Sequence, residues 1–228
     1  MKILRSFMAA FMIVLLFGNT ALAAESTTEK TAEADSAVEQ AGGTATSDVI
    51  VVENCYEFKS SYGYKYFIAV CSNNSSAKLD VSWDTVSFDE GGSILETGSS
   101  YNAYVEPNQN FVLYALFLNS EEAANYSYTI HYEESSYIMP ACSDVNLEAS
   151  VSGNGTLTLK ATNTSDTEIS TIQAATLFFD KEGTLVGFED SYIVNNNYNV
   201  EAGETIEKDV AIPEGTDNYE TYYTAYRW

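Results

Sequence analysis

Apolar and polar residues alternate along most of the chain after residue 48, in short runs that turn-forming residues separate. The alternation is clearest on either side of Ser152-Gly153-Asn154-Gly155. The apolar positions there are Val145, Leu147, Ala149 and Val151 before the turn, and Leu157, Leu159 and Ala161 after it. A period of two residues is that of a β-strand with one buried face. Because no stretch carries a sustained helical stripe, the pattern predicts an all-β chain of antiparallel hairpins.

The pattern occurs twice. The matching segments are Phe88-Asp89-Glu90-Gly91-Gly92 and Phe179-Asp180-Lys181-Glu182-Gly183, followed by Val105-Glu106 and Val200-Glu201. A repeated unit of fewer than about 100 residues has the size of a small domain. We therefore predict two tandem domains, residues 49–135 and residues 137–228.

Each unit holds about six or seven short strands at a spacing typical of an immunoglobulin-like sandwich. The predicted fold class is all-β, with two tandem antiparallel β-sandwich (immunoglobulin-like) domains after a signal peptide and a disordered leader. In the first unit the alternation changes phase between Trp83 and Val86. This change predicts a bulge or bend near Asp84.

The second unit resembles a known family. An Asn-x-Ser corner at Asn163, the run from Phe178 to Gly183 and the segment Val200-Glu201-Ala202-Gly203-Glu204 are similar to the FxLYD-type domains of secreted bacterial proteins. The first unit shares the Phe-Asp turn but has Pro107-Asn108-Gln109 at the later one. The resemblance implies an extracellular, immunoglobulin-like module without catalytic residues.

The two units differ on one predicted sheet face. The outward row of the first unit is apolar, whereas the corresponding row of the second is polar or suited to water. The apolar row is Val112, Tyr114, Leu116 and Leu118, and the neighbouring strand adds Phe67. A monomer rarely exposes such a patch. Two explanations stay open at this point: the second domain or the linker covers the face, or the face binds another protein or a second copy.

The first residues have the pattern of an export signal. Residues 1–23 begin with Lys2 and Arg5, continue with an apolar run and end with Ala21-Leu22-Ala23, a small-x-small cleavage site. The apolar run is shorter than the roughly 20 residues that span a bilayer. Residues 24–48 contain no aromatic residue and no periodicity, which is typical of disorder. We predict a secreted, extracellular protein with no membrane span after cleavage.

The charge of the chain restricts its partners. The formal net charge is −23, from 33 acidic and 10 basic residues. Nucleic acids and anionic membrane surfaces need cationic patches, so this balance argues against both. It favours solubility and cationic partners such as metal ions or basic proteins.

The three cysteines suggest one disulfide. Export permits disulfide bonds. A hairpin folded about Gly63 places Cys55 opposite Cys71, and we predict a cross-strand bridge between them. Cys142 then has no partner within the chain, and it is either a free thiol or part of an intermolecular bridge.

No group of residues indicates a reaction. His131 is the only histidine and has no neighbouring nucleophile and acid. The abundant carboxylates lack the spacing of a calcium loop, so we predict no catalytic residue, no metal site and no cofactor. The chain also has 17 tyrosines, which suit strands and cores but also stack on sugars. The sequence thus favours a non-catalytic protein-binding or structural module, with glycan binding through exposed tyrosines as the alternative.

Overall fold

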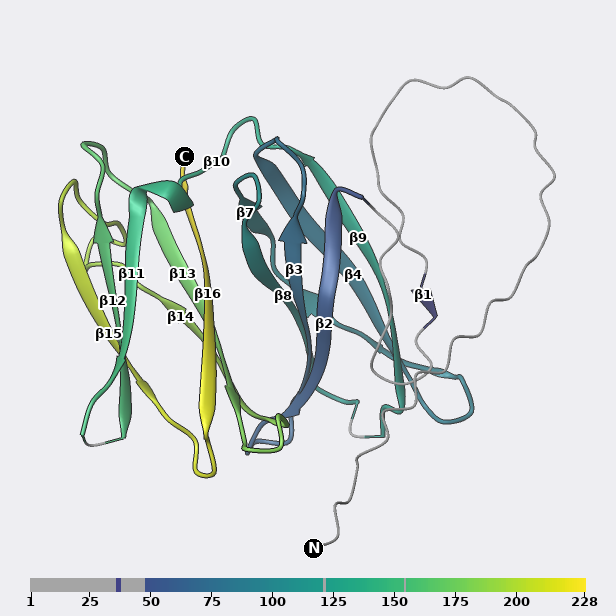
Figure 1. The fold of residues 1–228 in the computed structure, drawn as a ribbon. Helices are drawn as coiled ribbons and strands as arrows, with labels where there is room; N and C mark the ends of the chain where they lie inside the picture. The colour runs from purple at the N-terminus through teal and green to yellow at the C-terminus, as the bar shows by residue number, and fades with distance from the viewer. Residues whose placement is uncertain (1–35, 38–47, 121, 154) are drawn as a thin grey trace, which may run out of the picture.

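The computed structural model describes residues 36–37, 48–120, 122–153 and 155–228. Its strands form four antiparallel sheets, which stand side by side as layers (Figure 1). The first sandwich comprises two of these sheets. One sheet contains β1 (Ser36–Ala37), β4 (Leu79–Phe88), β5 (Ile94–Thr97), β7 (Ala103–Val105) and β9 (Asn125–Glu134). The other contains β2 (Ile50–Lys59), β3 (Lys65–Asn73), β6 (Ser99–Ser100) and β8 (Asn110–Phe117).

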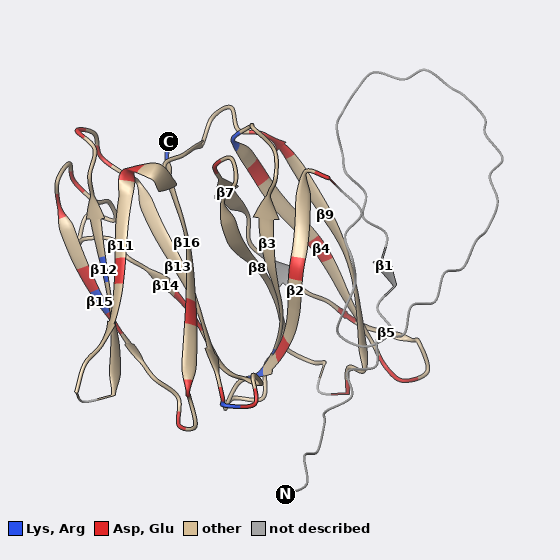
Figure 2. Cartoon of the chain, in the orientation of Figure 1, with Lys and Arg blue, Asp and Glu red and all other residues tan. Residues whose placement is uncertain are grey.

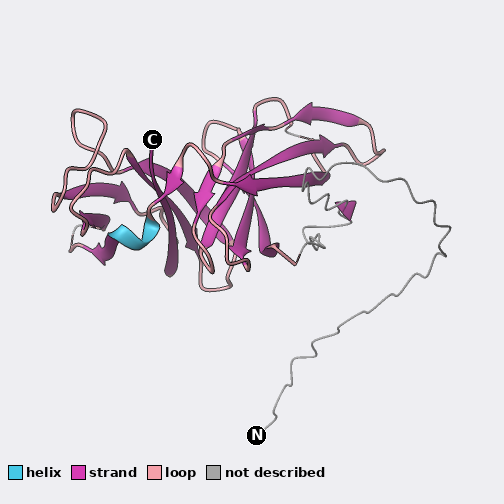
Figure 3. Cartoon of the chain, turned by 90° about the horizontal axis from the view of Figure 1, so that it is seen from above, coloured by secondary structure: helices cyan, strands magenta, loops and turns pink. Residues whose placement is uncertain are grey.

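The second sandwich comprises the other two sheets. One contains β10 (Met139–Pro140), β13 (Thr171–Phe179), β14 (Leu185–Tyr192) and β16 (Asn218–Arg227). The other contains β11 (Val145–Val151), β12 (Thr156–Asn163) and β15 (Thr205–Ala211). A 3₁₀ turn, Cys142–Asp144, precedes β11 and is the short helical piece in Figure 3. The predicted all-β class with tandem antiparallel sandwiches is confirmed.

Each sandwich has its own apolar core between its two sheets. In the first, the ring of Phe67 stacks on Tyr126 and Trp83, with ring centroids 4.7 and 5.5 Å away. The inward residues of β8 are Phe111, Leu113, Ala115 and Phe117, and all are buried as the alternation predicted. In the second, inward residues of β12 and β13 include Leu157, Leu159 and Phe178. Burial of these rows is the main stabilising term of each sandwich.

A fully buried asparagine occupies the same place in both sandwiches. Asn73 ends β3, and its amide donates to the carbonyl oxygens of Ala77 and Glu106 while its Oδ1 accepts from Ser75. Asn163 ends β12 and makes the corresponding bonds. Each asparagine joins a corner of its chain to a distant loop. This network confirms the corner at Asn163, shows the same corner at Asn73, and relates the two repeats at an offset of 90 positions (163 − 73).

The Phe-Asp turn is also the same in both units. Oδ1 of Asp89 accepts a hydrogen bond from the Ser93 amide, and Oδ1 of Asp180 accepts one from Thr184. Gly92 and Gly183 have φ angles of 80° and 81°, a region that residues with a Cβ rarely adopt. These residues therefore form hairpin loops, as the sequence predicted.

The predicted bend near Asp84 is wrong. β4 pairs without interruption with β9 from Leu79 to Phe88. Its alternation continues because Thr85 and Ser87 occupy buried positions that the apolar pattern assigned to Val86 and Phe88. The Ser87 hydroxyl is 2.7 Å from the Ser120 hydroxyl, a hydrogen bond that lets this polar group lie in the interior.

The predicted disulfide is also wrong. All three cysteines are free, and Cys55 lies opposite Ala69 while Cys71 lies opposite Val52. The hairpin pairs about Tyr62, one residue earlier than the predicted Gly63, and an irregularity between Val52 and Asn54 shifts the register again. A small shift of register separates two cysteines that simple counting places opposite each other.

We expect the three thiols to react slowly in the folded protein and rapidly in the unfolded protein. Burial raises the pKa of Cys55 and of Cys142 to about 11, and it raises the pKa of Cys71 well above its ordinary value. The thiolate is the reactive form, so Ellman's reagent at about pH 8 should label the native chain slowly. Unfolding without a reductant should then expose three fast thiols. A single fast thiol in that sample would contradict the register described above.

The predicted signal peptide lies outside the described residues, as does most of the predicted leader. Within the leader, Ser36–Ala37 pair with Tyr128 and Ser127 of β9. Among the residues that the structure describes, no helix has the length and apolar character to cross a bilayer.

Candidate functional site

A third apolar cluster, which we call the junction cluster, joins the two sandwiches. It lies between the outer face of the β2-β3-β8 sheet and the outer face of the β13-β14-β16 sheet. Its buried members are Ile68, Val70 and Tyr114 from the first sandwich and Leu177 and Phe179 from the second. The ring of Tyr56 meets that of Phe179 edge-on at 5.4 Å. The outer sheet face of the first sandwich is therefore apolar, and the second sandwich covers it.

Phe67 does not belong to this face. The buried asparagines relate β3 to β12 at an offset of 90, which makes Phe67 the counterpart of Leu157, a core residue. The Phe-Asp turns, by contrast, relate the repeats at an offset of 91 (180 − 89). The prediction that Phe67 faces outward used this second offset for β3, and a shift of one residue reverses the face of every side chain. The outward residues of β3 are instead Ile68 and Val70.

The other predicted binding residues divide into three groups. Val112 and Tyr114 pack in the junction cluster, so the second sandwich occupies the place predicted for a partner protein or domain. Leu116 is half-buried and lies at the rim of this contact. Leu118 follows the end of β8 and is 51% exposed. Of the two explanations for the apolar row, coverage by the second sandwich is the one that the structure shows for Val112 and Tyr114.

A polar contact closes one side of the junction. The Tyr114 hydroxyl donates a hydrogen bond of 2.7 Å to Oδ2 of Asp190 in the second sandwich. The Gln173 amide donates to both oxygens of the same carboxylate, at 2.9 and 3.0 Å. Burial, and then the charge of Asp190, raises the pKa of Tyr114 above its ordinary value. The phenol therefore stays protonated near neutral pH and keeps its donor role.

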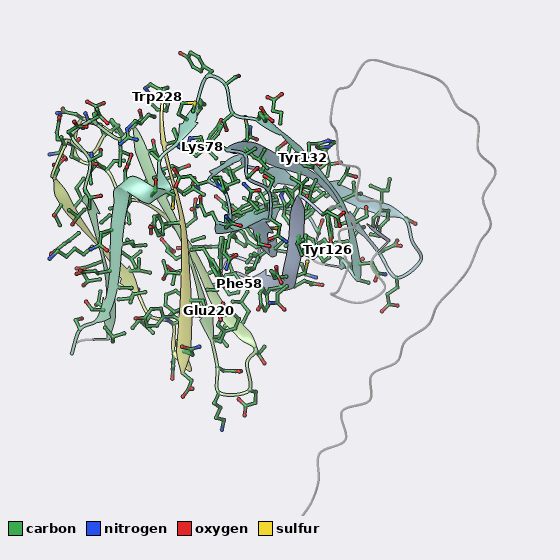
Figure 4. The ribbon with its side chains drawn as sticks, turned by 45° about the horizontal axis from the view of Figure 1, so that its top comes forward. Phe58, Lys78, Tyr126, Tyr132, Glu220 and Trp228 are labelled. Carbon is green, nitrogen blue, oxygen red and sulfur yellow. The ribbon has the colours of Figure 1, made fainter. Side chains whose placement is uncertain are left out.

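A second polar contact lies beside the linker. The carboxylate of Glu106 accepts hydrogen bonds from the Ser143 amide and hydroxyl, at 2.6 and 3.0 Å. Lys78 forms an ion pair with Glu106 at 3.0 Å and donates to the Pro140 carbonyl at 2.8 Å. Figure 4 shows Lys78 in the region between the two sandwiches, near the linker. Glu106 is buried, so its charge needs these partners.

At the rim near Asp190, the junction opens into a groove with a cavity volume of about 250 Å³. We call it the junction groove. Its lining residues are Tyr66, Tyr101, Tyr114, Leu116, Phe188, Glu189 and Asp190. Strands β3 and β8 and the loop before β7 supply the residues of the first sandwich, and β14 supplies those of the second. Because both sandwiches contribute, the groove exists only where they are packed together.

The junction groove is aromatic and acidic. Tyr101 is 48% exposed, Tyr66 and Phe188 are half-buried, and Glu189 is exposed. Burial raises the pKa of Asp190, although its bonds with Tyr114 and Gln173 lower it. Burial and the charge of Asp190 also raise the pKa of Glu189. Among the described residues that line the groove there is no Lys or Arg, in keeping with the general scarcity of basic residues in Figure 2.

The sequence reasoning missed Tyr101 and Phe188 and did not connect Tyr66 with Asp190. One pattern could have indicated the contact. The run Ala174-Ala175-Thr176-Leu177-Phe178-Phe179 is almost wholly apolar, which is typical of a strand that is buried on both faces. It predicts that the second sandwich also has an apolar outer face, complementary to that of the first. The sequence contains no comparable indication of the position of Tyr101, which lies in a loop.

The other candidate chemistries stay apart from the groove. His131 Nε2 lies 2.9 Å from Oδ2 of the exposed Asp84 on the outer face of the first sandwich. Within the described part of the chain, no three His, Cys, Asp or Glu side chains are grouped so that they could hold a metal ion. The Asp89 and Asp180 carboxylates bond the backbone of their own turns.

The comparisons with known proteins identify no family. No family model matches the chain, and no curated protein matches its sequence. Among solved structures, a match is the N-terminal CBM22-1-CBM22-2 tandem domain from Paenibacillus barcinonensis Xyn10C. The identity is 11%, the match covers 85% of this chain and 86% of that one, and the TM-score is 0.17. At this TM-score the two structures do not superpose closely, and no property of that protein is transferred to this chain.

Proposed function

We propose that the protein is a non-catalytic binding module of the bacterial cell exterior that holds a protein partner at the junction groove. The observation that carries this proposal is the grouping of three exposed or half-exposed aromatic rings with two carboxylates at one rim. Aromatic side chains supply large contact areas at a low cost in conformational entropy, and they are enriched in protein interfaces.

The location outside the cell follows from the export signal in the sequence. The acidic character of the chain, with a net charge of −23, attracts basic partners and repels acidic ones. The apolar cluster below the groove is already used for contact between the sandwiches. The proposed partner therefore meets the rim of the junction and leaves the apolar sheet face covered.

The proposal is tested by selecting peptides from a random library displayed on phage against the full mature chain. The same selection is repeated on the Tyr101→Leu variant, which removes one exposed ring of the groove. Tyr137→Leu is the matched control, because Tyr137 is 80% exposed and does not line the groove. We expect enriched peptides that bind the wild type and Tyr137→Leu, with binding to Tyr101→Leu weakened about fivefold or more.

Two outcomes would overturn the proposal. One is the absence of any peptide that binds above the background of the uncoated support. The other is a set of peptides that bind Tyr101→Leu as tightly as the wild type, because their contact would lie elsewhere on the protein.

A second candidate function, carbohydrate binding, is supported by a different pair of rings. Tyr62 and Tyr64 lie in the β2–β3 turn, 83% and 41% exposed, with centroids 6.5 Å apart and planes inclined by 33°. Exposed rings of this kind stack on sugar faces. The test is retention of the protein on insoluble cellulose, chitin or xylan. Retention should be lost in the Tyr62→Ala and Tyr64→Ala variants and kept in Tyr137→Ala; equal retention of all variants, or none, excludes this function.

A further inference from the structure

Four aromatic rings contact one another at the wall of the junction groove and do not share a plane. The inclinations and centroid distances are 49° and 6.4 Å for Tyr66–Tyr114, 54° and 5.6 Å for Tyr66–Phe188, 60° and 5.1 Å for Tyr114–Phe188, and 34° and 5.1 Å for Tyr101–Tyr114. A sugar ring stacks on one ring face or on coplanar rings. Because these rings contact one another, they give the groove a wall of tilted ring faces and edges and no flat platform, which suits a compact group better than a flat one.

The groove carries negative charge that its own residues do not neutralise. Asp190 receives its hydrogen bonds from Tyr114 and Gln173, which are neutral donors. Among the Lys and Arg ion pairs of the described residues, none includes Asp190 or Glu189. Lys208 is near enough to lower the pKa of Glu189 but does not line the groove. The faces of aromatic rings are also negative, so rings and carboxylates attract a cation together.

The size of the groove limits the ligand to the end of one side chain. Its volume of about 250 Å³ is below the roughly 300–1,000 Å³ of pockets that enclose drug-sized molecules. Leu116 adds an apolar wall, against which a chain of methylene groups can pack. These features together describe an alkyl chain that ends in a compact positive charge.

An ammonium group fits this site better than a guanidinium group. The planar guanidinium of arginine is best held by two free oxygens of one carboxylate. Here both oxygens of Asp190 already accept hydrogen bonds. The other carboxylate of the groove, that of Glu189, is exposed to water, where an ion pair contributes less than about 1 kcal/mol. An ammonium is a point charge that interacts with several inclined rings at once. We infer that the junction groove binds the side-chain ammonium of a lysine that the partner protein presents.

The inference rests on the proposed function for the source of the lysine, but its chemistry is testable without a partner. The full chain is titrated with N-acetyl-lysine methylamide at an ionic strength of about 0.15 M, and the backbone amide shifts are followed by NMR. The neutral control is the matching derivative of 2-aminoheptanoic acid, in which a methyl group replaces the ammonium. We expect shifts at Tyr101, Phe188 and Asp190, and about tenfold tighter binding of the lysine probe than of the neutral probe.

Variants locate the effect. Tyr101→Leu removes a ring face, and Asp190→Asn removes the charge while keeping an oxygen that accepts from Tyr114. Each should weaken binding of the lysine probe about fivefold and leave the neutral probe unchanged. Tyr137→Leu should bind both probes like the wild type. Equal binding of the two probes, or unchanged binding by Tyr101→Leu, overturns the inference.

Two further outcomes separate this inference from the proposed function. Tighter binding of tetramethylammonium than of the lysine probe overturns the assignment to lysine and indicates a quaternary ammonium ligand. Selected peptides that need Tyr101 but contain no essential lysine would leave the proposed function standing and overturn this inference. Conversely, lysine-probe binding at Tyr101 without any selected peptide would uphold the ammonium site and overturn the proposed peptide binding.

Discussion

Val70→Lys is expected to separate the two sandwiches while leaving each core folded. Val70 is buried in the junction cluster and belongs to neither sandwich core. A lysine there places an ammonium without a carboxylate partner between two apolar sheets, at a cost on the order of 3–5 kcal/mol. We expect an unchanged far-ultraviolet circular dichroism spectrum, a larger radius of gyration in small-angle X-ray scattering, and two unfolding transitions in place of one.

The matched control is the reverse substitution at the equivalent position. Val70 lies opposite Val112 on β8, and Lys160 lies opposite Glu207 on β15, so the two positions correspond in the repeats. Lys160 is exposed on the outer face of the second sandwich. Lys160→Val removes one exposed charge, and charge interactions at an exposed position contribute less than about 1 kcal/mol. If Val70→Lys retains the wild-type radius and a single transition at the wild-type midpoint, the junction described above is wrong.

Asn163→Ala is expected to destabilise the second sandwich by about 3–5 kcal/mol, measured as the free energy of unfolding in urea. The Asn163 amide donates to the carbonyl oxygens of Thr167, Val200 and Glu201, at 2.8, 3.1 and 3.1 Å. Alanine removes both N–H donors and with them all three hydrogen bonds, and each buried acceptor that loses its partner costs about 1–3 kcal/mol. Water has poor access to this corner because Asn163 is fully buried.

Two comparisons separate the hydrogen bonds from the loss of volume. Asn163→Asp keeps the shape but loses the donors, so it should destabilise the protein as strongly as alanine does. Asn146→Ala removes an exposed amide that donates a hydrogen bond to Glu148. It should change the free energy of unfolding by less than about 0.5 kcal/mol. A loss below about 1 kcal/mol for Asn163→Ala would show that the network does not hold the corner.

The outer faces of the two end layers differ from the two faces that meet at the junction. The β2-β3-β8 sheet of the first sandwich packs on the β13-β14-β16 sheet of the second, so the repeats are stacked in the same direction. A contact of this kind could continue with further copies. The outer face of the last sheet carries Thr158, Lys160 and Asp209, and that of the first carries Ser82, Asp84 and His131. Polar faces of this kind do not favour a further apolar contact of the type seen at the junction.

The same asymmetry produces the candidate site. If the two repeats were identical, the outer faces of the β2-β3-β8 and β11-β12-β15 sheets would have the same character. Two polar faces would leave the sandwiches apart, and two apolar faces would allow further copies to pack on. In the first repeat, Ile68 and Val70 occupy the positions that Thr158 and Lys160 occupy in the second. These two residues make the outer face of the first repeat apolar, so that it packs against the second sandwich. The junction groove is the rim of that contact, where aromatic side chains are only partly covered. Binding at the groove thus depends on the cohesion of the two sandwiches.

The sequence by itself determined the features that depend on neighbouring residues. Alternation of apolar residues specified the strands, and Asp89 with Gly92, like Asp180 with Gly183, specified the turns, because these choices involve a few consecutive residues. The repeat was visible because the turns kept their residues. The apolar outer face of the first unit was also visible, although Phe67 was assigned to it through a shift of one position.

Only the tertiary structure decided what meets that face. Whether Tyr114 contacts a partner or Asp190 depends on residues that are 76 positions apart in the chain, and alternation within a strand carries no information about such contacts. The register of Cys55 and Cys71 likewise depends on the turn, which pairs the two strands about Tyr62, and on an irregularity in β2 between Val52 and Asn54. Each sandwich supplies only part of the lining of the junction groove, and burial of the junction cluster holds the two parts side by side. Local sequence does not specify which two faces pack together.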